Sequence, residues 1–222
     1  MALIITIDGP GRSGKDSAAS KLCQELSFEH VDLGLGFRGL ASRVLNDQPN
    51  LEKALLEFCL SDMRRSGLRT PQVDAKTHEL SADPSVRKIL EARLIGLVLS
   101  KERVIVTGRS GHYLFPAPGK AVLNIFLTAS LERRVERECH KSGKSKDEAR
   151  ASLFGRDRED MERSVHPLLS NEQARKVALK NHHFYYLDNS GLCEDDTFFD
   201  LIGRCRLVLE LWQNIPELIR PR

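Results

Sequence analysis

A glycine-rich turn between a strand-like run and a helical pattern constrains this chain more than any other feature. Residues 3–17 read Leu-Ile-Ile-Thr-Ile-Asp-Gly-Pro-Gly-Arg-Ser-Gly-Lys-Asp-Ser. The backbone N–H groups of such a turn surround phosphate oxygens, and the start of the following helix adds partial positive charge. The pattern Gly-x4-Gly-Lys is met from Gly9 to Lys15, and the Lys15 ammonium would contact the β- and γ-phosphates. The sequence therefore predicts a site for a polyphosphate tail.

The residue after Lys15 departs from the strict pattern, because Asp16 takes the place of Ser or Thr and Ser17 follows one position late. Three interpretations of Asp16 stay open. It could be an ordinary acidic residue in a first helical turn, it could repel a triphosphate, or it could be a ligand of Mg²⁺, which carboxylates commonly hold. The predicted phosphate and metal site comprises Gly9, Pro10, Gly11, Arg12, Ser13, Gly14, Lys15, Asp16 and Ser17, with Asp16 and Ser17 as the metal ligands.

Composition excludes several classes of protein. The chain has 222 residues, of which 41% are hydrophobic and 29% charged; this length fits one domain with insertions or two small ones. No apolar run approaches the roughly 20 residues that span a bilayer. The five cysteines form no Cys-x-x-Cys motif, which argues against a disulfide framework. With a net charge of only +3, we expect a cytoplasmic monomer that binds a small molecule and neither membrane nor nucleic acid.

Strand-like runs alternate with helical patterns along most of the chain, which predicts a parallel sheet with right-handed crossovers. The predicted strands are Leu3–Ile7, Phe28–Asp32, Arg103–Thr107, Ala121–Leu127 and His183–Leu187. The predicted helices are Lys15–Leu26, Gly36–Leu45, Leu51–Arg65, Pro71–Leu80, Val86–Leu99, Ala129–His140, Lys146–Arg163 and Thr197–Trp212. About five strands fit a three-layer α/β domain.

Two segments lie outside the alternation, a helical one over about 39–85 and a highly charged one over about 139–158. Both are candidates for mobile caps over a phosphate site. We expect one domain over 1–222, whose core comprises 1–38, 86–138 and 159–222. Asp8 is interpreted as a cap or brace for the turn, with a catalytic or metal-binding role as the alternative. Most of the arginines at 133, 134, 137, 150 and 158 are interpreted as a solvated, salt-bridged surface, because glutamates surround them.

Several blocks in order resemble bacterial cytidylate (CMP) kinases. They include Ile5-Thr-Ile-Asp-Gly-Pro, Val31-Asp-Leu-Gly-Leu-Gly-Phe-Arg, Gly108-Arg109, Ile125-Phe-Leu-Thr-Ala-Ser, and Arg156-Asp-Arg-Glu-Asp-Met-Glu-Arg-Ser-Val-His-Pro-Leu. The resemblance implies a three-layer P-loop kinase fold of about five parallel strands, with 39–85 as a helical acceptor-binding insertion and 139–158 as a short lid. It also implies transfer of the γ-phosphoryl group of ATP to CMP or dCMP with Mg²⁺.

The resemblance also assigns roles to individual residues. Lys15, Arg109, Arg156 and Arg163 would be catalytic, since guanidinium groups match the charge that develops on a transferring phosphoryl group. Arg156, Asp160 and Arg163 would lie on one face of a continuous helix. The residues implied to bind the acceptor are Asp32, Arg38, His78, Arg87, Arg109, Ser110 and Asp160.

Some positions of the family pattern are changed. Both acids of the family's Asp-Gly-Arg-Asp motif are replaced, by Thr107 and Ser110, and His78 stands in place of a serine near the base. Leu33 replaces a turn hydroxyl. The first hypothesis is a nucleoside monophosphate kinase for CMP, dCMP or a related nucleotide. The alternatives are a non-catalytic relative that binds a nucleotide, and a kinase for a different small metabolite.

Overall fold

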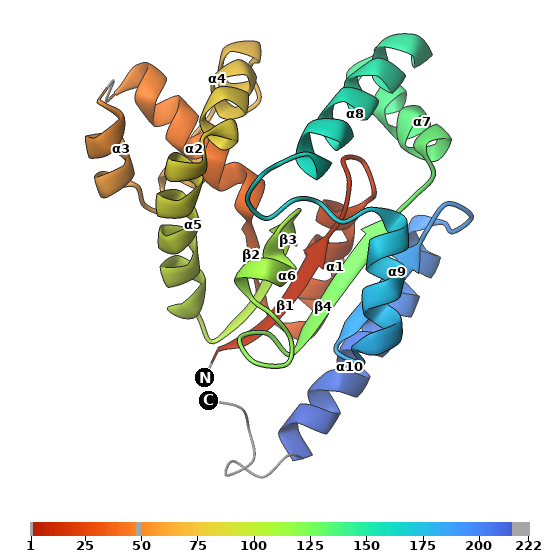
Figure 1. Ribbon diagram of the computed structural model, residues 1–222. Coiled ribbons are helices and arrows are strands. Elements are labelled where there is room, and N and C mark those ends of the chain that lie inside the picture. The colour runs from red at the N-terminus through yellow and green to blue at the C-terminus, as the bar shows by residue number, and fades with distance from the viewer. Residues whose placement is uncertain (1, 48–49, 215–222) are drawn as a thin grey trace. The chain divides into compact units, whose positions relative to one another are not determined.

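A five-stranded sheet organises the chain in the computed structural model, which describes residues 2–47 and 50–214. Its order is β2 (Glu29–Asp32), β3 (Arg103–Gly108), β1 (Leu3–Asp8), β4 (Leu123–Thr128) and β5 (Phe184–Asp188) (Figure 1). The central strand β1 pairs in parallel with β3 and β4, and β4 pairs in parallel with β5. In such sheets ligands bind beyond the carboxyl ends of the strands, which is where the glycine-rich turn begins.

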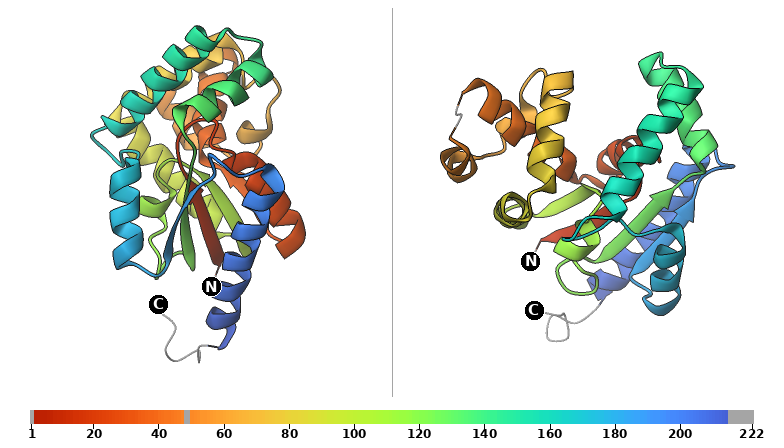
Figure 2. Two further views of the ribbon diagram at one scale, coloured as in Figure 1. Left: turned by 90° about the vertical axis from the view of Figure 1, so that its right-hand side faces the viewer. Right: turned by 45° about the horizontal axis from the view of Figure 1, so that its top comes forward.

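Helices cover both faces of the sheet and give three layers, because the central strands are apolar on both faces. Helices α1 (Lys15–Leu26) and α10 (Glu194–Asn214) pack on the face that carries Ile125 and Leu127. Helix α9 (Asn171–Lys180) packs on the opposite face, against Phe126 of β4 and Phe184 of β5. Figure 2 shows the sheet between these helices. The predicted three-layer architecture and its five parallel strands are confirmed.

The chain divides into two compact units, which are described separately. The first comprises residues 1–30 and 103–222, and the second comprises residues 31–102, a wider segment than the predicted insertion over about 39–85. The second unit contains α2 (Leu33–Asn46), α3 (Leu51–Glu57), a 3-10 turn (Asp62–Arg64), α4 (Pro71–Ala82) and α5 (Pro84–Leu99).

A buried carboxylate interrupts the helix predicted over Leu51–Arg65, and that prediction is wrong beyond Glu57. Asp62 is fully buried and accepts a hydrogen bond of 2.9 Å from the Cys59 N–H. It also forms ion pairs with Arg43 and Arg65. Burial raises the pKa of Asp62, but this hydrogen bond and the two guanidinium groups outweigh burial and hold the pKa below its ordinary value.

The first unit contains further helices at the carboxyl ends of the strands: α6 (Gly111–Leu114), α7 (Leu131–Ser142) and α8 (Lys146–Met161). Helix α8 ends two residues before the predicted end at Arg163. Helices α6 and α9 are absent from the prediction, although α9 begins with a capping box between Ser170 and Gln173, a recognisable start signal. Among residues 2–47 and 50–214, no helix has the length and apolar character to cross a bilayer.

Candidate active site

The backbone of the glycine-rich turn requires glycine at its first position and at the start of α1. Gly9 has a φ of 149°, and a Cβ there would lie 2.0 Å from the carbonyl oxygen of Leu127, so only glycine fits. Gly14 caps α1 in a left-handed conformation with a φ of 96°. The Lys15 Nζ donates to the Pro10 carbonyl at 3.1 Å and so lies across the turn. The turn thus places an ammonium group beside its own backbone, at the start of a helix where a polyphosphate could be held.

Asp16 and Ser17 are exposed in the first turn of α1. Within the described part of the chain, the Asp16 carboxylate forms no hydrogen bond or ion pair, so it does not bind the amides of the turn. A carboxylate and a hydroxyl are oxygen donors of the kind that Mg²⁺ prefers beside phosphates and water. The residues present therefore fit a magnesium–nucleotide complex.

Asp8, at the end of β1, is almost wholly buried and fully engaged. Its Oδ1 accepts from the Gly111 N–H at 2.8 Å, and its Oδ2 accepts from the His112 N–H at 2.7 Å. The His112 Nδ1 also hydrogen-bonds Oδ2, at 2.8 Å. Asp8 thus braces the start of the turn against the segment that follows Arg109, in agreement with its interpretation as a brace.

Two of the predicted catalytic arginines share one acid. The buried Asp160 of α8 forms ion pairs with both Arg109 and Arg163. Arg109 lies against the turn, since a Cβ on Gly11 would be 3.4 Å from its Nη2. The predicted single helical face is wrong in part, because α8 ends at Met161 and Arg163 lies beyond it. Arg156 is exposed and, among the described residues, does not pair with Asp160.

The interpretation of Arg134 and Arg137 as solvated residues is wrong. Arg134 is buried on α7, and its Nη1 donates to Asp157 at 2.6 Å and to the Gly11 carbonyl at 3.3 Å. The Arg137 Nη1 donates to the Arg12 carbonyl at 3.1 Å. Burial, followed by the nearby Arg133, lowers the pKa of Arg137. Arg134 and Arg137 thus bind backbone carbonyls of the glycine-rich turn.

The remaining predicted acceptor-binding residues are divided between the units, and those of the second unit have partners within it. The Asp32 Oδ1 accepts from the Gly34 N–H and caps α2. Arg38 donates to the Leu68 carbonyl at 2.8 Å and pairs with Asp74. The first unit contributes Ser110, which is buried at the start of α6, besides Arg109 and Asp160.

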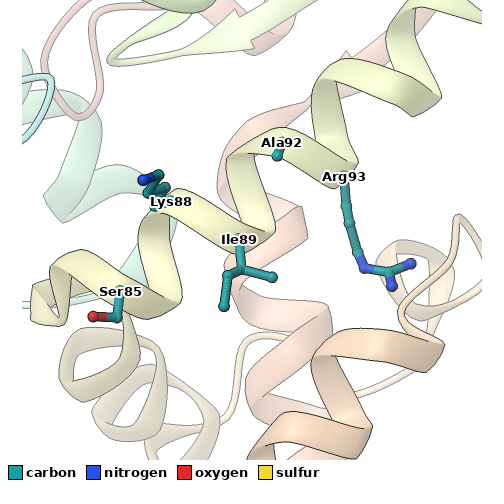
Figure 3. A pocket seen from close by; sticks show the side chains of 5 residues that line it. All are labelled: Ser85, Lys88, Ile89, Ala92 and Arg93. Carbon is teal, nitrogen blue, oxygen red and sulfur yellow. The ribbon is translucent and has the colours of Figure 1, made fainter.

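Arg87 of α5 is buried and held inside the second unit. Its Nη1 donates to Glu91 at 2.8 Å, its Nε and Nη2 donate to the Ser81 carbonyl, and its guanidinium lies 4.7 Å from the ring centroid of Phe37. His78 is exposed on α4. Neither residue lines the cavity of about 610 Å³ on α5. Figure 3 shows the residues that do: Ser85, Lys88, Ile89, Ala92 and Arg93. None of these belongs to the predicted site.

The profile of the family described as Cytidylate kinase matches residues 5–183. The chain belongs to the cytidylate kinase family. A cytidylate kinase of Granulibacter bethesdensis is 32% identical over 189 residues, which cover 78% of this chain and 87% of the relative. Another, of Carboxydothermus hydrogenoformans, is 32% identical over 235 residues and covers 92% of this chain and 99% of the relative. The predicted family is confirmed.

Solved structures agree on the fold. A gluconokinase from Sinorhizobium meliloti superposes with a TM-score of 0.53 at 15% identity, covering 96% of this chain and 98% of that one. A protein from Eubacterium ventriosum superposes with a TM-score of 0.56 at 12% identity, covering 91% and 97%. At such identities the likeness concerns the fold alone, and it supports the predicted P-loop kinase architecture.

At one position where this chain departs from the cytidylate kinase pattern, the structure shows which contact the substituted residue makes. Thr107, which stands where the family has an acid, is fully buried at the end of β3. Its Oγ1 lies 2.9 Å from the Nε2 of His30 on β2. A hydrogen-bonded pair therefore occupies this position, and the nearby Asp8 carboxylate is already engaged. His30 carries no sequence signal of its own, because the contact depends on the pairing of two strands.

Proposed function

We propose that the protein is a nucleoside monophosphate kinase that transfers the γ-phosphoryl group of ATP to CMP, dCMP or a related nucleotide. The observation that carries the proposal is the arrangement within the first unit. There, the Lys15 ammonium lies across the turn. Arg109 lies against Gly11 of the same turn and shares Asp160 with Arg163. Membership of the cytidylate kinase family supports the same reaction.

The proposed chemistry needs positioning and charge more than acid–base groups. An oxygen of the acceptor phosphate forms a bond to the γ-phosphorus, the bond from that phosphorus to the bridging oxygen breaks, and ADP leaves. Since the attacking oxygen is already anionic, no general base is required. Lys15 and the amides of the turn hold the donor, while Arg109 and Arg163 stabilise the charge that spreads over the equatorial oxygens. Arg156, Arg38 and Arg87 remain proposed contacts of the nucleotides.

The proposal is tested by turnover with ATP, Mg²⁺ and a panel of nucleoside monophosphates, each followed by chromatography of the nucleotides. We expect formation of the diphosphate from CMP or dCMP, or from a close analogue, far above a Lys15→Ala control. A panel without any diphosphate above that control would contradict the proposal. Calorimetry would then separate the rivals, because ATP binding without turnover indicates a non-catalytic relative or a different acceptor.

Asp16 and Ser17 are the proposed ligands of Mg²⁺, which when bound would neutralise charge on the phosphates. Asp16→Asn is expected to raise the Mg²⁺ concentration for half-maximal activity about tenfold, which corresponds to about 1.4 kcal/mol. Asp195→Asn is the matched control, because Asp195 is an exposed acid in the first turn of α10.

The same titration distinguishes the three interpretations of Asp16. An unchanged magnesium requirement together with an unchanged affinity for ATP would indicate an ordinary surface acid. Tighter ATP binding by Asp16→Asn, with no change in the magnesium requirement, would indicate that the carboxylate opposes the triphosphate.

A further inference from the structure

Three successive carbonyl oxygens of the glycine-rich turn each accept a hydrogen bond from a side chain outside the turn. The pairs are Arg134 Nη1 with Gly11 O at 3.3 Å, Arg137 Nη1 with Arg12 O at 3.1 Å, and Asn189 Nδ2 with Ser13 O at 3.0 Å. The two arginines come from α7, and Asn189 directly follows β5. Elements far apart in the sequence therefore bind the carbonyl oxygens of one short turn.

The direction of these bonds matters for phosphate binding. In a planar trans peptide the carbonyl and the N–H point in opposite directions. A side chain that fixes a carbonyl outward therefore fixes the orientation of the N–H in the same peptide unit. Phosphate binding in such turns depends on several N–H groups that converge on one point. The three held carbonyls belong to the peptide units that carry the N–H groups of Arg12, Ser13 and Gly14. The Ser13 N–H donates to the Pro10 carbonyl at 3.4 Å within the turn. The clamp therefore sets the orientation of the Arg12 and Gly14 amides before any phosphate arrives.

The donors are themselves held in place. The Arg134 Nε donates to the Ala129 carbonyl at 3.1 Å, and Asp157 of α8 accepts from its Nη1. The Asn189 N–H donates to the Thr128 carbonyl at 2.9 Å, and its Oδ1 accepts from the Arg137 Nη1 at 3.3 Å. Asn189 is 3% exposed. Arg134 and Asn189 are buried, and the half-buried Arg137 is bonded to Asn189, so these donors hold the carbonyls far better than mobile surface side chains could.

We propose that Arg134, Arg137 and Asn189 form a carbonyl clamp, a set of positioning residues that preorganises the turn for the phosphates of the donor nucleotide. The clamp rests on the proposed function in one respect, namely that ATP is the ligand of the turn. Its action differs from simple charge attraction, because Asn189 is neutral and because each donor acts on a carbonyl and not on the phosphate.

Two variants distinguish an effect on the geometry of the turn from an effect of the positive charge near it. Asn189→Ala removes the bonds to Ser13 and to Arg137 without changing the net charge. Arg137→Lys keeps the cation but loses the planar group that reaches Arg12 and Asn189 together. Arg133→Ala is the matched control, since Arg133 is a half-exposed cation on α7 that pairs with Glu136. ATP with Mg²⁺ and inorganic tripolyphosphate are titrated by calorimetry, and urea unfolding confirms that each variant is folded.

We expect Asn189→Ala and Arg137→Lys to weaken both ligands by about fivefold to tenfold, as loss of one net hydrogen bond would, and Arg133→Ala to stay within about twofold. Hydrogen exchange of the amides at 12–14 should quicken in the ligand-free variants while the strands keep their protection. Folded variants with wild-type affinity would overturn the clamp. Equal weakening by Arg133→Ala, with Asn189→Ala unaffected, would also overturn it in favour of charge alone. A wild-type protein that binds neither ligand would overturn both the clamp and the proposed donor site.

Discussion

Lys15→Ala is expected to lower kcat/KM for ATP about 10³-fold, which corresponds to about 4 kcal/mol of transition-state stabilisation. The Lys15 ammonium already lies across the turn through its bond to the Pro10 carbonyl, so a bound triphosphate would meet a positioned charge. Steady-state turnover with saturating acceptor measures the effect. Its main component should be in kcat, because charge on the β- and γ-oxygens grows as the phosphoryl group leaves.

Lys21→Ala is the control for this substitution. Lys21 lies on the same helix, but its ammonium pairs with the exposed acids Glu194 and Asp195. Exposed pairs of this kind contribute little to stability, so the variant should keep wild-type turnover. If Lys15→Ala retained more than a tenth of the activity, the turn would not be the donor site.

Gly9→Ala is expected to destabilise the fold by about 3–5 kcal/mol, from overpacking and from a backbone conformation that disfavours a side chain. The added Cβ would lie 2.0 Å from the Leu127 carbonyl oxygen, a backbone atom of β4 that cannot rotate away. Urea unfolding of the purified protein measures the loss. Any folded fraction should bind ATP poorly, because the turn would have to move off the end of the sheet.

Replacement of Gly203 by alanine should have the opposite effect on the free energy of unfolding. A Cβ at Gly203 would meet nothing within 4 Å, and the residue lies inside α10. Glycine costs about 0.5–1 kcal/mol relative to alanine in a helix interior, so Gly203→Ala should stabilise the protein by this amount. A Gly9→Ala variant as stable as the wild type would show that the turn can relax away from Leu127.

The sequence predicts the sheet well because the signal there is local. Four of the five strands are short, largely apolar runs, whereas β2 is mostly polar. The structure has all five within a few residues of the predicted ends. Helix α1 has the predicted bounds, since Gly14 and Ser27 stop it at both ends. The errors occur where tertiary contacts decide. The helix over Leu51–Arg65 breaks because Asp62 finds buried cations, and no periodicity reveals that.

The candidate site likewise contains some residues that sequence motifs reveal and others that only tertiary packing reveals. The glycine-rich turn, Lys15 and Arg109 follow from motifs. The role of Arg134 and Arg137 does not, because α7 carries many arginines and glutamates, and only packing under the turn distinguishes these two from the exposed Arg133. Asn189 offered a weaker signal, since it directly follows a strand of the sheet and polar residues at that edge are ligand candidates.

The engaged carboxylate of Asp8 has a further consequence. Because its two oxygens accept hydrogen bonds from the backbone at Gly111 and His112, we expect the end of β1 and the segment after Arg109 to move together. We therefore expect Arg109 to exchange Asp160 for a substrate oxygen through a change of its side chain alone. The reorganisation that a looser site would undergo at each turnover is completed once, when the chain folds.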